Sequence, residues 1–178
     1  MPDLSVVIPV QNEQENIQLL IDEVRQALDD VIDYELIYVN DGSDDATLDI
    51  LKQNQVENTR LRIFSHATGV GQSTAVRTGV LNSRSPVIAT LDGDGQNDPA
   101  DIPALYQALH EQSGTGVVLV NGYRKKRRDT AIKRVSSRLA NAIRSGLLDD
   151  ETPDTGCGLK VFSRDAYLEI PFFDHLHR

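Results

Sequence analysis

A short apolar segment runs directly into a group of carboxylates in the stretch Pro86-Val87-Ile88-Ala89-Thr90-Leu91-Asp92-Gly93-Asp94-Gly95-Gln96-Asn97-Asp98-Pro99. Its first part, Pro86–Leu91, is rich in β-branched residues, which predicts a buried strand. Asp98 can cap a helix that has Pro99 at its first position. The strand therefore delivers Asp92 and Asp94 to the carboxyl edge of a sheet, which is where open α/β sheets bind ligands.

The two carboxylates have a functional interpretation and a purely structural one. Oxygen ligands at this position suit Mg²⁺ or Mn²⁺ held beside a diphosphate. The alternative is a solvated acidic turn, because Asp and Gly are common turn residues. The strand before the pair and the helix cap after it favour the ligand site.

The same alternation of strand and helix continues along the whole chain. The segment Leu4–Val10 is a near-continuous apolar run, typical of a parallel strand that is covered on both faces. Further strands are predicted over Tyr34–Asn40, Leu61–Ser65, Val117–Asn121 and Gly158–Phe162. No repeat or linker interrupts the pattern. The sequence predicts a single α/β domain over residues 1–178, with a mostly parallel central sheet flanked by helices.

Two more carboxylates follow predicted strands. Glu13 comes after the first strand and Asp41 after the second. Because strand ends are neighbours in a parallel sheet, we expect both to share one cleft with Asp92 and Asp94.

Helix starts are also predicted next to these positions. Asn12 and Glu15 have the spacing of a capping box, ahead of a helix that begins near Ile17. Ser43 or Asp44 is expected to cap the helix after the second strand.

Composition excludes several classes of protein. The formal net charge of -9 argues against a general nucleic-acid binder. The single cysteine, Cys157, excludes an internal disulfide and a cysteine-based zinc site, and we expect it to be a small buried residue. The chain has no signal segment and no apolar run near the ~18 residues of a membrane span. We therefore expect a soluble, cytoplasmic polypeptide.

Basic residues gather in one segment of this acidic chain. Eight of the 18 Lys and Arg residues lie between positions 124 and 138. Such a run is usually a solvated loop. It also forms a local anion site, suited to phosphates or to anionic lipid headgroups.

Three motifs together carry a resemblance to a known family: Pro9–Asn16, Val39–Asp45 and Leu91–Pro99. They resemble the motifs of family 2 glycosyltransferases, and within that family the polyprenyl-phosphate sugar transferases of the dolichyl-phosphate mannose synthase type. Further matching segments follow in the expected order, and the resemblance covers nearly the whole chain. These segments are Gly71–Ser73, Asn121–Arg124, Ser137–Asn141 and Asp154–Lys160.

The resemblance implies a GT-A fold and an inverting transfer of a sugar from a UDP- or GDP-sugar to a polyprenyl phosphate, with Mg²⁺ or Mn²⁺ as cofactor. It implies a nucleotide pocket made by Pro9, Val10, Asn12, Glu13, Asp41 and Asp92. It implies metal contacts from Asp92, Asp94 and Gln96. The catalytic residues that it implies are Asp94, Arg124, Arg134 and Asp154. Donor or acceptor phosphate would be bound by Arg124, Arg134 and Ser137.

The acceptor decides whether a base is needed. A phosphate acceptor is already ionised at neutral pH, so positioning and stabilisation of the leaving diphosphate suffice. A hydroxyl acceptor, which is the alternative transferase, needs a general base. Asp154 is then the candidate, although an acidic turn is its other interpretation.

Two features depart from the family pattern. Gln11 stands where many relatives have another residue before the Asn-Glu pair, which leaves the nucleobase open. Relatives of this type usually continue into membrane segments, so we expect residues 1–178 to be a truncated catalytic domain. The full-length protein is then expected at the cytoplasmic face of the membrane.

Three rival functions make different demands on the sequence. A sugar-1-phosphate nucleotidyltransferase needs a Gly-rich basic loop after the first strand, and Gln11-Asn12-Glu13 is not one. A Mg²⁺-binding regulatory module without catalytic activity is shorter and has no counterpart to the basic segment. A catalytically dead scaffold is disfavoured by the presence of both Asp92 and Asp94.

Overall fold

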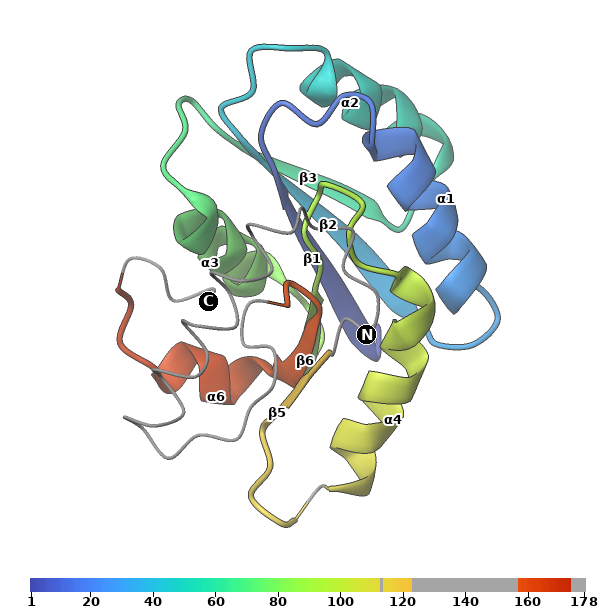
Figure 1. Ribbon diagram of the computed structural model, residues 1–178, viewed down its shortest axis with the longest axis vertical. Coiled ribbons are helices and arrows are strands. Elements are labelled where there is room, and N and C mark those ends of the chain that lie inside the picture. Colours follow the sequence, from blue (N-terminus) through green and yellow to red (C-terminus); the bar gives the residue numbers. More distant parts are fainter. Residues whose placement is uncertain (113, 123–156, 174–178) are drawn as a thin grey trace, which may run out of the picture.

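The computed structural model describes residues 1–112, 114–122 and 157–173 and shows a mixed sheet between two layers of helices (Figure 1). The strand order is β3-β2-β1-β4-β6-β5. Four strands run parallel to one another: β1 (Leu4–Val10), β2 (Tyr34–Asp41), β3 (Leu61–His66) and β4 (Val87–Thr90). The strand β6 (Lys160–Ser163) runs antiparallel to both β4 and β5 (Leu119–Asn121). The predicted α/β class with a mostly parallel sheet is confirmed.

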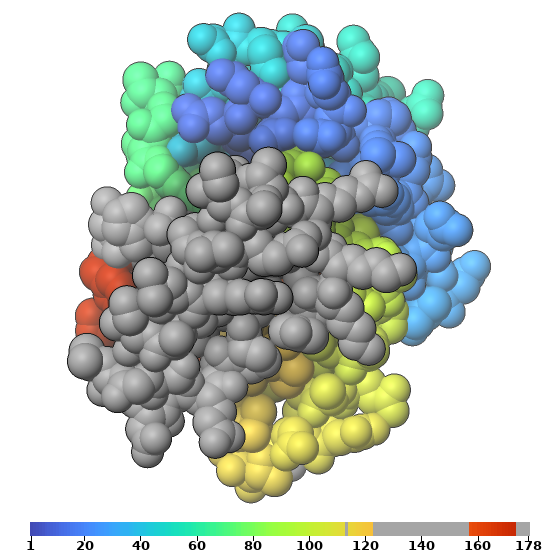
Figure 2. Space-filling model, in the orientation of Figure 1, coloured from blue at the N-terminus to red at the C-terminus, as the bar shows by residue number. Residues whose placement is uncertain are grey.

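Helices cover both faces of the sheet (Figure 1). One face packs against α1 (Ile17–Leu28), α2 (Thr47–Glu57) and α4 (Ile102–Glu111). The other packs against α3 (Gln72–Asn82) and α6 (Arg164–Glu169). The surfaces of α1, in blue, and α4, in yellow, follow one another along one side of the molecule (Figure 2). In the part of the chain that the structure describes, no helix is long and apolar enough to cross a membrane.

The first strand explains why the sheet needs both layers. Every residue of β1 is buried. Val6 and Ile8 point into the core with α1, whereas Val7 packs with α3 on the opposite face. Since successive side chains of a strand alternate between faces, only a strand covered on both sides can be apolar throughout. The continuous apolar pattern is thereby accounted for.

The predicted caps of the first two helices are wrong. Asn12 does not cap α1, which begins at Ile17. Its side-chain oxygen accepts a hydrogen bond from the N–H of Asp44 at 2.9 Å, and its own N–H donates to Ser43 Oγ at 2.9 Å. The side chain that meets the first turn of α2 belongs to Asp45, whose Oδ1 accepts from the Thr47 N–H at 2.9 Å.

The position of these loops explains the error. Because β1 and β2 are parallel neighbours, the loops after them lie side by side. Polar side chains then pair across the two loops instead of with their own helices. Asn12 has a φ of 57°, in the left-handed region that Asn tolerates better than most residues.

Other local predictions are confirmed. Asp98 Oδ1 accepts a hydrogen bond from the N–H of Ala100 at 3.0 Å, in a 3₁₀ turn, η1 (Pro99–Asp101), that leads into α4. Cys157 is buried. The ends of five strands differ from the prediction by one or two residues, and among the strands of the described residues only β1 has the predicted bounds. The largest differences are at β5, which begins at Leu119, and at β6, which spans Lys160–Ser163.

Candidate functional site

A cavity of about 300 Å³ lies at the carboxyl edge of the parallel strands. It brings together the four carboxylates that the sequence places at strand ends, which are Glu13, Asp41, Asp92 and Asp94. Its remaining walls come from the end of β1 and the loop after it, the first turns of α3 and the loop after β4. These lining residues are Pro9, Val10, Gln11, Gln72, Ala75 and Gly93. The expected shared cleft is therefore present.

Asp41 is the most deeply placed of the four carboxylates. It is the last residue of β2 and is 4 % exposed. Its Oδ1 lies 2.7 Å from Nδ1 of His66 and 3.0 Å from the backbone nitrogen of Val70. Its Oδ2 accepts a hydrogen bond from the N–H of Gly71 at 2.8 Å. The carboxylate thus holds the loop between β3 and α3 against the end of β2.

These contacts decide the charge of Asp41. Burial favours the neutral acid and by itself raises the pKa of Asp41. Hydrogen bonds from the Val70 N–H, the His66 ring and the Gly71 N–H outweigh burial and hold the pKa below its usual range. Asp41 is therefore an ionised group at neutral pH, and it presents only hydrogen-bond acceptors to the cavity.

Asp92 is oriented by the Gln72 side chain and by the backbone at Gly158. Its Oδ1 accepts a hydrogen bond from Gln72 Nε2, at the start of α3, at 2.7 Å. Its carboxylate also lies directly against Gly158, where any side chain would overlap it. Thr90 donates a hydrogen bond to the carbonyl of Gly158 at 2.9 Å and so holds that backbone beside the end of β4.

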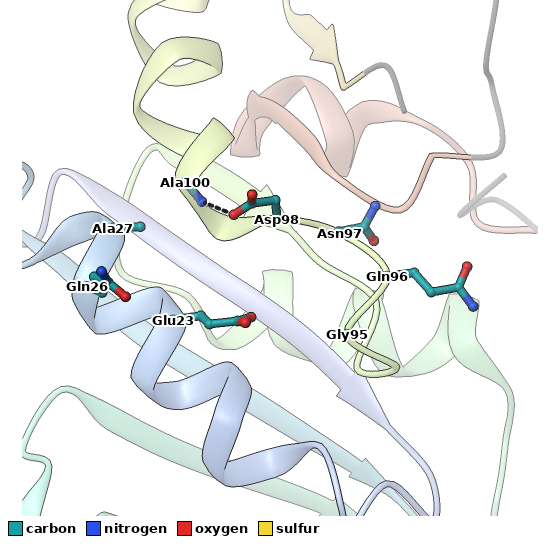
Figure 3. Close-up of a pocket in the computed structure, with 8 residues that line it drawn as sticks. All are labelled: Glu23, Gln26, Ala27, Gly95, Gln96, Asn97, Asp98 and Ala100. Atoms are coloured by element: carbon teal, nitrogen blue, oxygen red, sulfur yellow. Dashed lines mark hydrogen bonds between the residues drawn. The ribbon is translucent and has the colours of Figure 1, made fainter. Parts of the chain in front are cut away.

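Asp94 is more exposed, and the loop around it lines two cavities. Its Oδ1 accepts a hydrogen bond from the N–H of Gln96 at 3.0 Å. Gln96 itself lines a second cavity of about 520 Å³ together with Glu23 and Gln26 of α1. In Figure 3 the Gln96 side chain points away from α1, while Glu23 reaches toward the loop. A metal-ligand role for Gln96 stays a prediction.

The loop after β1 contributes in two different ways. Glu13 lines the first cavity, and its Oε2 accepts a hydrogen bond from Asn16 Nδ2 at 2.6 Å. Asn12 is not among the residues that line this cavity, and its side chain binds the neighbouring loop. The structure therefore places Asn12 as a support of the site's wall, and nucleotide contact by Asn12 stays a prediction.

Four predicted site residues lie outside the described residues. Their roles in binding phosphate or in catalysis therefore stay predictions. They are Arg124, Arg134, Ser137 and Asp154.

Sequence reasoning missed two polar residues that shape the site. His66 and Gln72 bind the carboxylates of Asp41 and Asp92, respectively. His66 directly follows the predicted third strand, just as Asp41 directly follows the predicted second strand. Its position at the carboxyl edge of the sheet could therefore have been predicted. Gln72 lies in the matching segment Gly71–Ser73, but no local pattern pairs it with Asp92, which lies 20 residues further along the chain.

The donor set fits a divalent cation that is shared with a ligand. Among residues 1–112, 114–122 and 157–173, no group of three or more His, Cys, Asp or Glu side chains could hold a metal by itself. Asp92 and Asp94 nevertheless line one cavity. Mg²⁺ is commonly bound by one or two carboxylates together with substrate phosphates, so two protein carboxylates suffice when a diphosphate supplies further oxygens.

Comparison with known proteins gives the family. The family model described as Glycosyl transferase family 2 matches residues 5–170. The chain belongs to this family. It is 34% identical over 182 residues to the dodecaprenyl-phosphate galacturonate synthase of Rhizobium johnstonii, an alignment that covers 99% of the chain and 52% of the relative. It is 34% identical over 164 residues to the undecaprenyl-phosphate 4-deoxy-4-formamido-L-arabinose transferase of Photorhabdus laumondii, covering 90% and 49%.

The chain therefore spans about half the length of the curated relatives it matches. The resemblance to polyprenyl-phosphate sugar transferases is confirmed at the level of family membership and of these relatives' names.

Solved structures show the same fold. The glucosyl-3-phosphoglycerate synthase of Mycobacterium tuberculosis, solved with Mg²⁺ and UDP, aligns with a TM-score of 0.72 and 21% identity over 96% of the chain and 59% of that protein. A mannosyltransferase of Pyrobaculum calidifontis, solved with GDP-Man and Mn²⁺, gives 0.68 and 18% over 94% and 47%. The family 2 domain has the GT-A fold that the resemblance implied.

Proposed function

We propose that the full-length protein is an inverting glycosyltransferase that moves a sugar from a UDP- or GDP-sugar to a polyprenyl phosphate. The observation that carries the proposal is the cavity in which Asp41, Asp92 and Asp94 meet at the carboxyl edge of a family 2 domain. The names of the relatives support the class of acceptor, because both are polyprenyl-phosphate transferases.

Each carboxylate has a role in this proposal. Asp41 accepts a hydrogen bond from the nucleobase, and Pro9, Val10 and Glu13 line the same pocket. Asp92 and Asp94 hold Mg²⁺ or Mn²⁺, with Gln96 as a further candidate ligand. A metal held there would supply positive charge to the diphosphate that leaves when the sugar is transferred. Gln72 and Gly158 keep Asp92 in position for this contact.

The acceptor phosphate attacks as an anion, so the reaction needs no general base. Arg124, Arg134 and Ser137 are proposed to bind the acceptor phosphate or the donor diphosphate. Asp154 is the proposed base in the case of a hydroxyl acceptor. Residues 1–178 are proposed to form one catalytic domain, placed at the cytoplasmic face of a membrane in the full-length protein.

A panel of thermal unfolding measurements tests the donor site. UDP and GDP are added with and without Mn²⁺ to the wild-type chain, to Asp94→Ala and to Asp49→Ala. Asp49 is an exposed carboxylate on α2 and serves as the matched control. Ligand at about 100 times its dissociation constant stabilises the native state by about 2.7 kcal/mol. For a chain of this size that corresponds to a rise of roughly 5–10 °C in Tm.

The expected result is a metal-dependent rise with one nucleotide in the wild-type chain and in Asp49→Ala, and none in Asp94→Ala. Incubation of the full-length protein with the matching nucleotide sugar and a polyprenyl phosphate then tests transfer. Absence of any shift in the full-length protein contradicts a donor site. A shift without glycolipid product contradicts the proposed acceptor.

A further inference from the structure

A chain of hydrogen bonds runs behind the cavity from α3 to Asp41. His66 places Nδ1 2.7 Å from Asp41 Oδ1 and Nε2 2.9 Å from Thr78 Oγ1. An ionised carboxylate can only accept hydrogen bonds, so Nδ1 carries a proton and donates it to Asp41. Because Thr78 belongs to α3, this helix holds the far side of the ring and fixes the direction of the bond to Asp41.

The remaining acceptor capacity of Asp41 is small. A carboxylate has about four lone-pair positions on its two oxygens. Oδ1 is taken by His66 and by the Val70 N–H, at 2.7 and 3.0 Å. Oδ2 accepts from the Gly71 N–H at 2.8 Å, with the Val70 N–H as a longer contact at 3.2 Å. One position, on Oδ2, is left for a ligand that enters the cavity.

Nucleobases differ in the number of hydrogen bonds that they can donate to such a carboxylate. Uracil presents one ring N–H between two carbonyl oxygens, so a single free position on Oδ2 satisfies it. Guanine presents a ring N–H and an adjacent amino group, and this pair is satisfied by both oxygens of one carboxylate. With Oδ1 occupied by His66, one guanine donor would be desolvated without an acceptor, which is unfavourable.

We propose that His66 determines which nucleobase the site accepts, and that by occupying Asp41 Oδ1 it selects a uracil-type edge over guanine. The inference rests on the proposed function and specifies its donor as a uridine diphosphate sugar. Gln11 lines the same cavity, and its amide lies beside Gly69. It supplies an N–H donor for a carbonyl oxygen next to the ring N–H of uracil.

Two substitutions of His66 by side chains of nearly equal shape, Asn and Leu, distinguish selection of the base from simple support of the loop. His66→Asn keeps an amide donor close to the place of Nδ1, whereas His66→Leu removes every donor. Calorimetry measures the dissociation constants of UDP, GDP and inorganic pyrophosphate, each with Mg²⁺, for both variants and the wild type. His110→Leu, at an exposed histidine on α4, is the control.

We expect the wild type, His66→Asn and His110→Leu to prefer UDP over GDP. In His66→Leu the preference falls about tenfold or more, because a hydrogen bond to a charged group is lost and Oδ1 becomes open to guanine. Pyrophosphate affinity stays unchanged, since pyrophosphate has no base. Thr78→Val removes the hydroxyl that binds Nε2 of His66, and it should lower the preference for UDP by a smaller factor. This variant tests the inference if His66→Leu does not fold.

Different failures have different meanings. A wild type that binds UDP no more tightly than GDP overturns the inference and leaves a donor site of the proposed kind intact. A preference for UDP that survives in both His66→Leu and Thr78→Val overturns the role of His66. Equal weakening of all three ligands assigns His66 to the structure of the loop, against the inference. A wild type that binds neither nucleotide overturns the proposed function and the inference with it.

Discussion

The carboxylate of Asp41 accepts hydrogen bonds from its own chain, and these set how the stability of the fold depends on pH. The folded pKa of Asp41 lies below the unfolded value of about 3.9, so the unfolded chain binds more protons between the two values. The stabilisation from this group is fully present above the unfolded pKa. It is lost as the pH falls through the folded pKa.

Replacing this carboxylate should therefore flatten the acid side of the stability curve. We expect Asp41→Asn to be less stable than the wild type by about 1.5–3 kcal/mol at pH 7, because hydrogen bonds to a buried charge are lost. The difference should shrink as the pH is lowered from 5 to 3. Thermal unfolding followed by circular dichroism across this range measures both. Curves of Tm against pH that stay parallel contradict the prediction.

Gly158 controls Asp92 without taking part in any chemistry. A methyl group at this position would overlap the Asp92 carboxylate. Gly158→Ala is therefore expected to displace Asp92 and to weaken metal-dependent nucleotide binding about tenfold or more, the effect of losing about 1.4 kcal/mol. Titration of the variant with UDP and Mn²⁺ measures this loss.

Gly116 provides the matched control for that substitution. A methyl group there meets nothing within 4 Å, although its φ of 86° makes alanine strained. Gly116→Ala should lose about 1 kcal/mol of stability and keep its nucleotide affinity. If both variants bind as the wild type does, the position of Asp92 does not depend on Gly158.

Three strands and the loop before β4 are joined at the opposite edge of the sheet by one buried side chain. Glu35, in β2, accepts hydrogen bonds from Ser5 of β1 and from Arg62 of β3, both at 2.7 Å. It also accepts from the backbone N–H of Arg84 at 2.6 Å, just before β4. Arg62 in turn donates to the carbonyl of Asn82 at the end of α3. The element order around β1 is thus held by a polar centre as well as by apolar packing.

Removing this centre should affect stability and not the ligand site. Glu35→Ala removes the acceptor of the partly exposed Arg62 and of Ser5, and losing a hydrogen bond to a charged group costs about 1.5–3 kcal/mol. Denaturant unfolding measures the loss, with the exposed Glu57→Ala expected within about 0.5 kcal/mol of the wild type. The affinity of the folded variant for UDP and Mn²⁺ should be unchanged. If Glu35→Ala lowers the free energy of unfolding by less than about 1 kcal/mol, Glu35 does not act as a stabilising polar centre.

At the scale of the whole molecule, the sequence predicted what depends on local patterns. The apolar run of β1, the strand before Asp92 and the Asp98 cap each follow from neighbouring residues. Because parallel strands end at one edge, strand ends also predicted that Glu13, Asp41 and Asp94 would meet.

Contacts between segments that are distant in the sequence could not be predicted from local patterns. The insertion of β6 between β4 and β5 depends on pairing across more than 70 residues of chain between Ala89 and Val161, which a short apolar run does not encode. Asn12 was assigned to its own helix because local spacing cannot show that the loop containing Asp44 lies beside it. The predicted direction of strands and the predicted residues of the cavity therefore fared better than the predicted polar contacts.

The negative charge of the chain leads to a prediction about how salt affects metal-dependent nucleotide binding. The chain has a formal net charge of -9, and three exposed or partly exposed carboxylates, Glu13, Asp92 and Asp94, line the cavity. In the proposed function, a divalent cation bound there would add two positive charges next to the diphosphate of the donor. Salt screens such attraction, with a Debye length of about 10 Å at 0.1 M.

Raising NaCl should therefore weaken UDP binding more steeply with Mn²⁺ than with EDTA. With EDTA no cation attracts the diphosphate, and salt instead screens the repulsion between the carboxylates and UDP. The dissociation constant is measured by calorimetry from about 20 to 500 mM salt, a range over which the Debye length falls from about 20 Å to about 4 Å. In Asp94→Ala the two salt dependences should converge, because the metal no longer binds, whereas Asp49→Ala should keep them apart. Identical slopes in the wild type would mean that the cation does not sit beside the diphosphate.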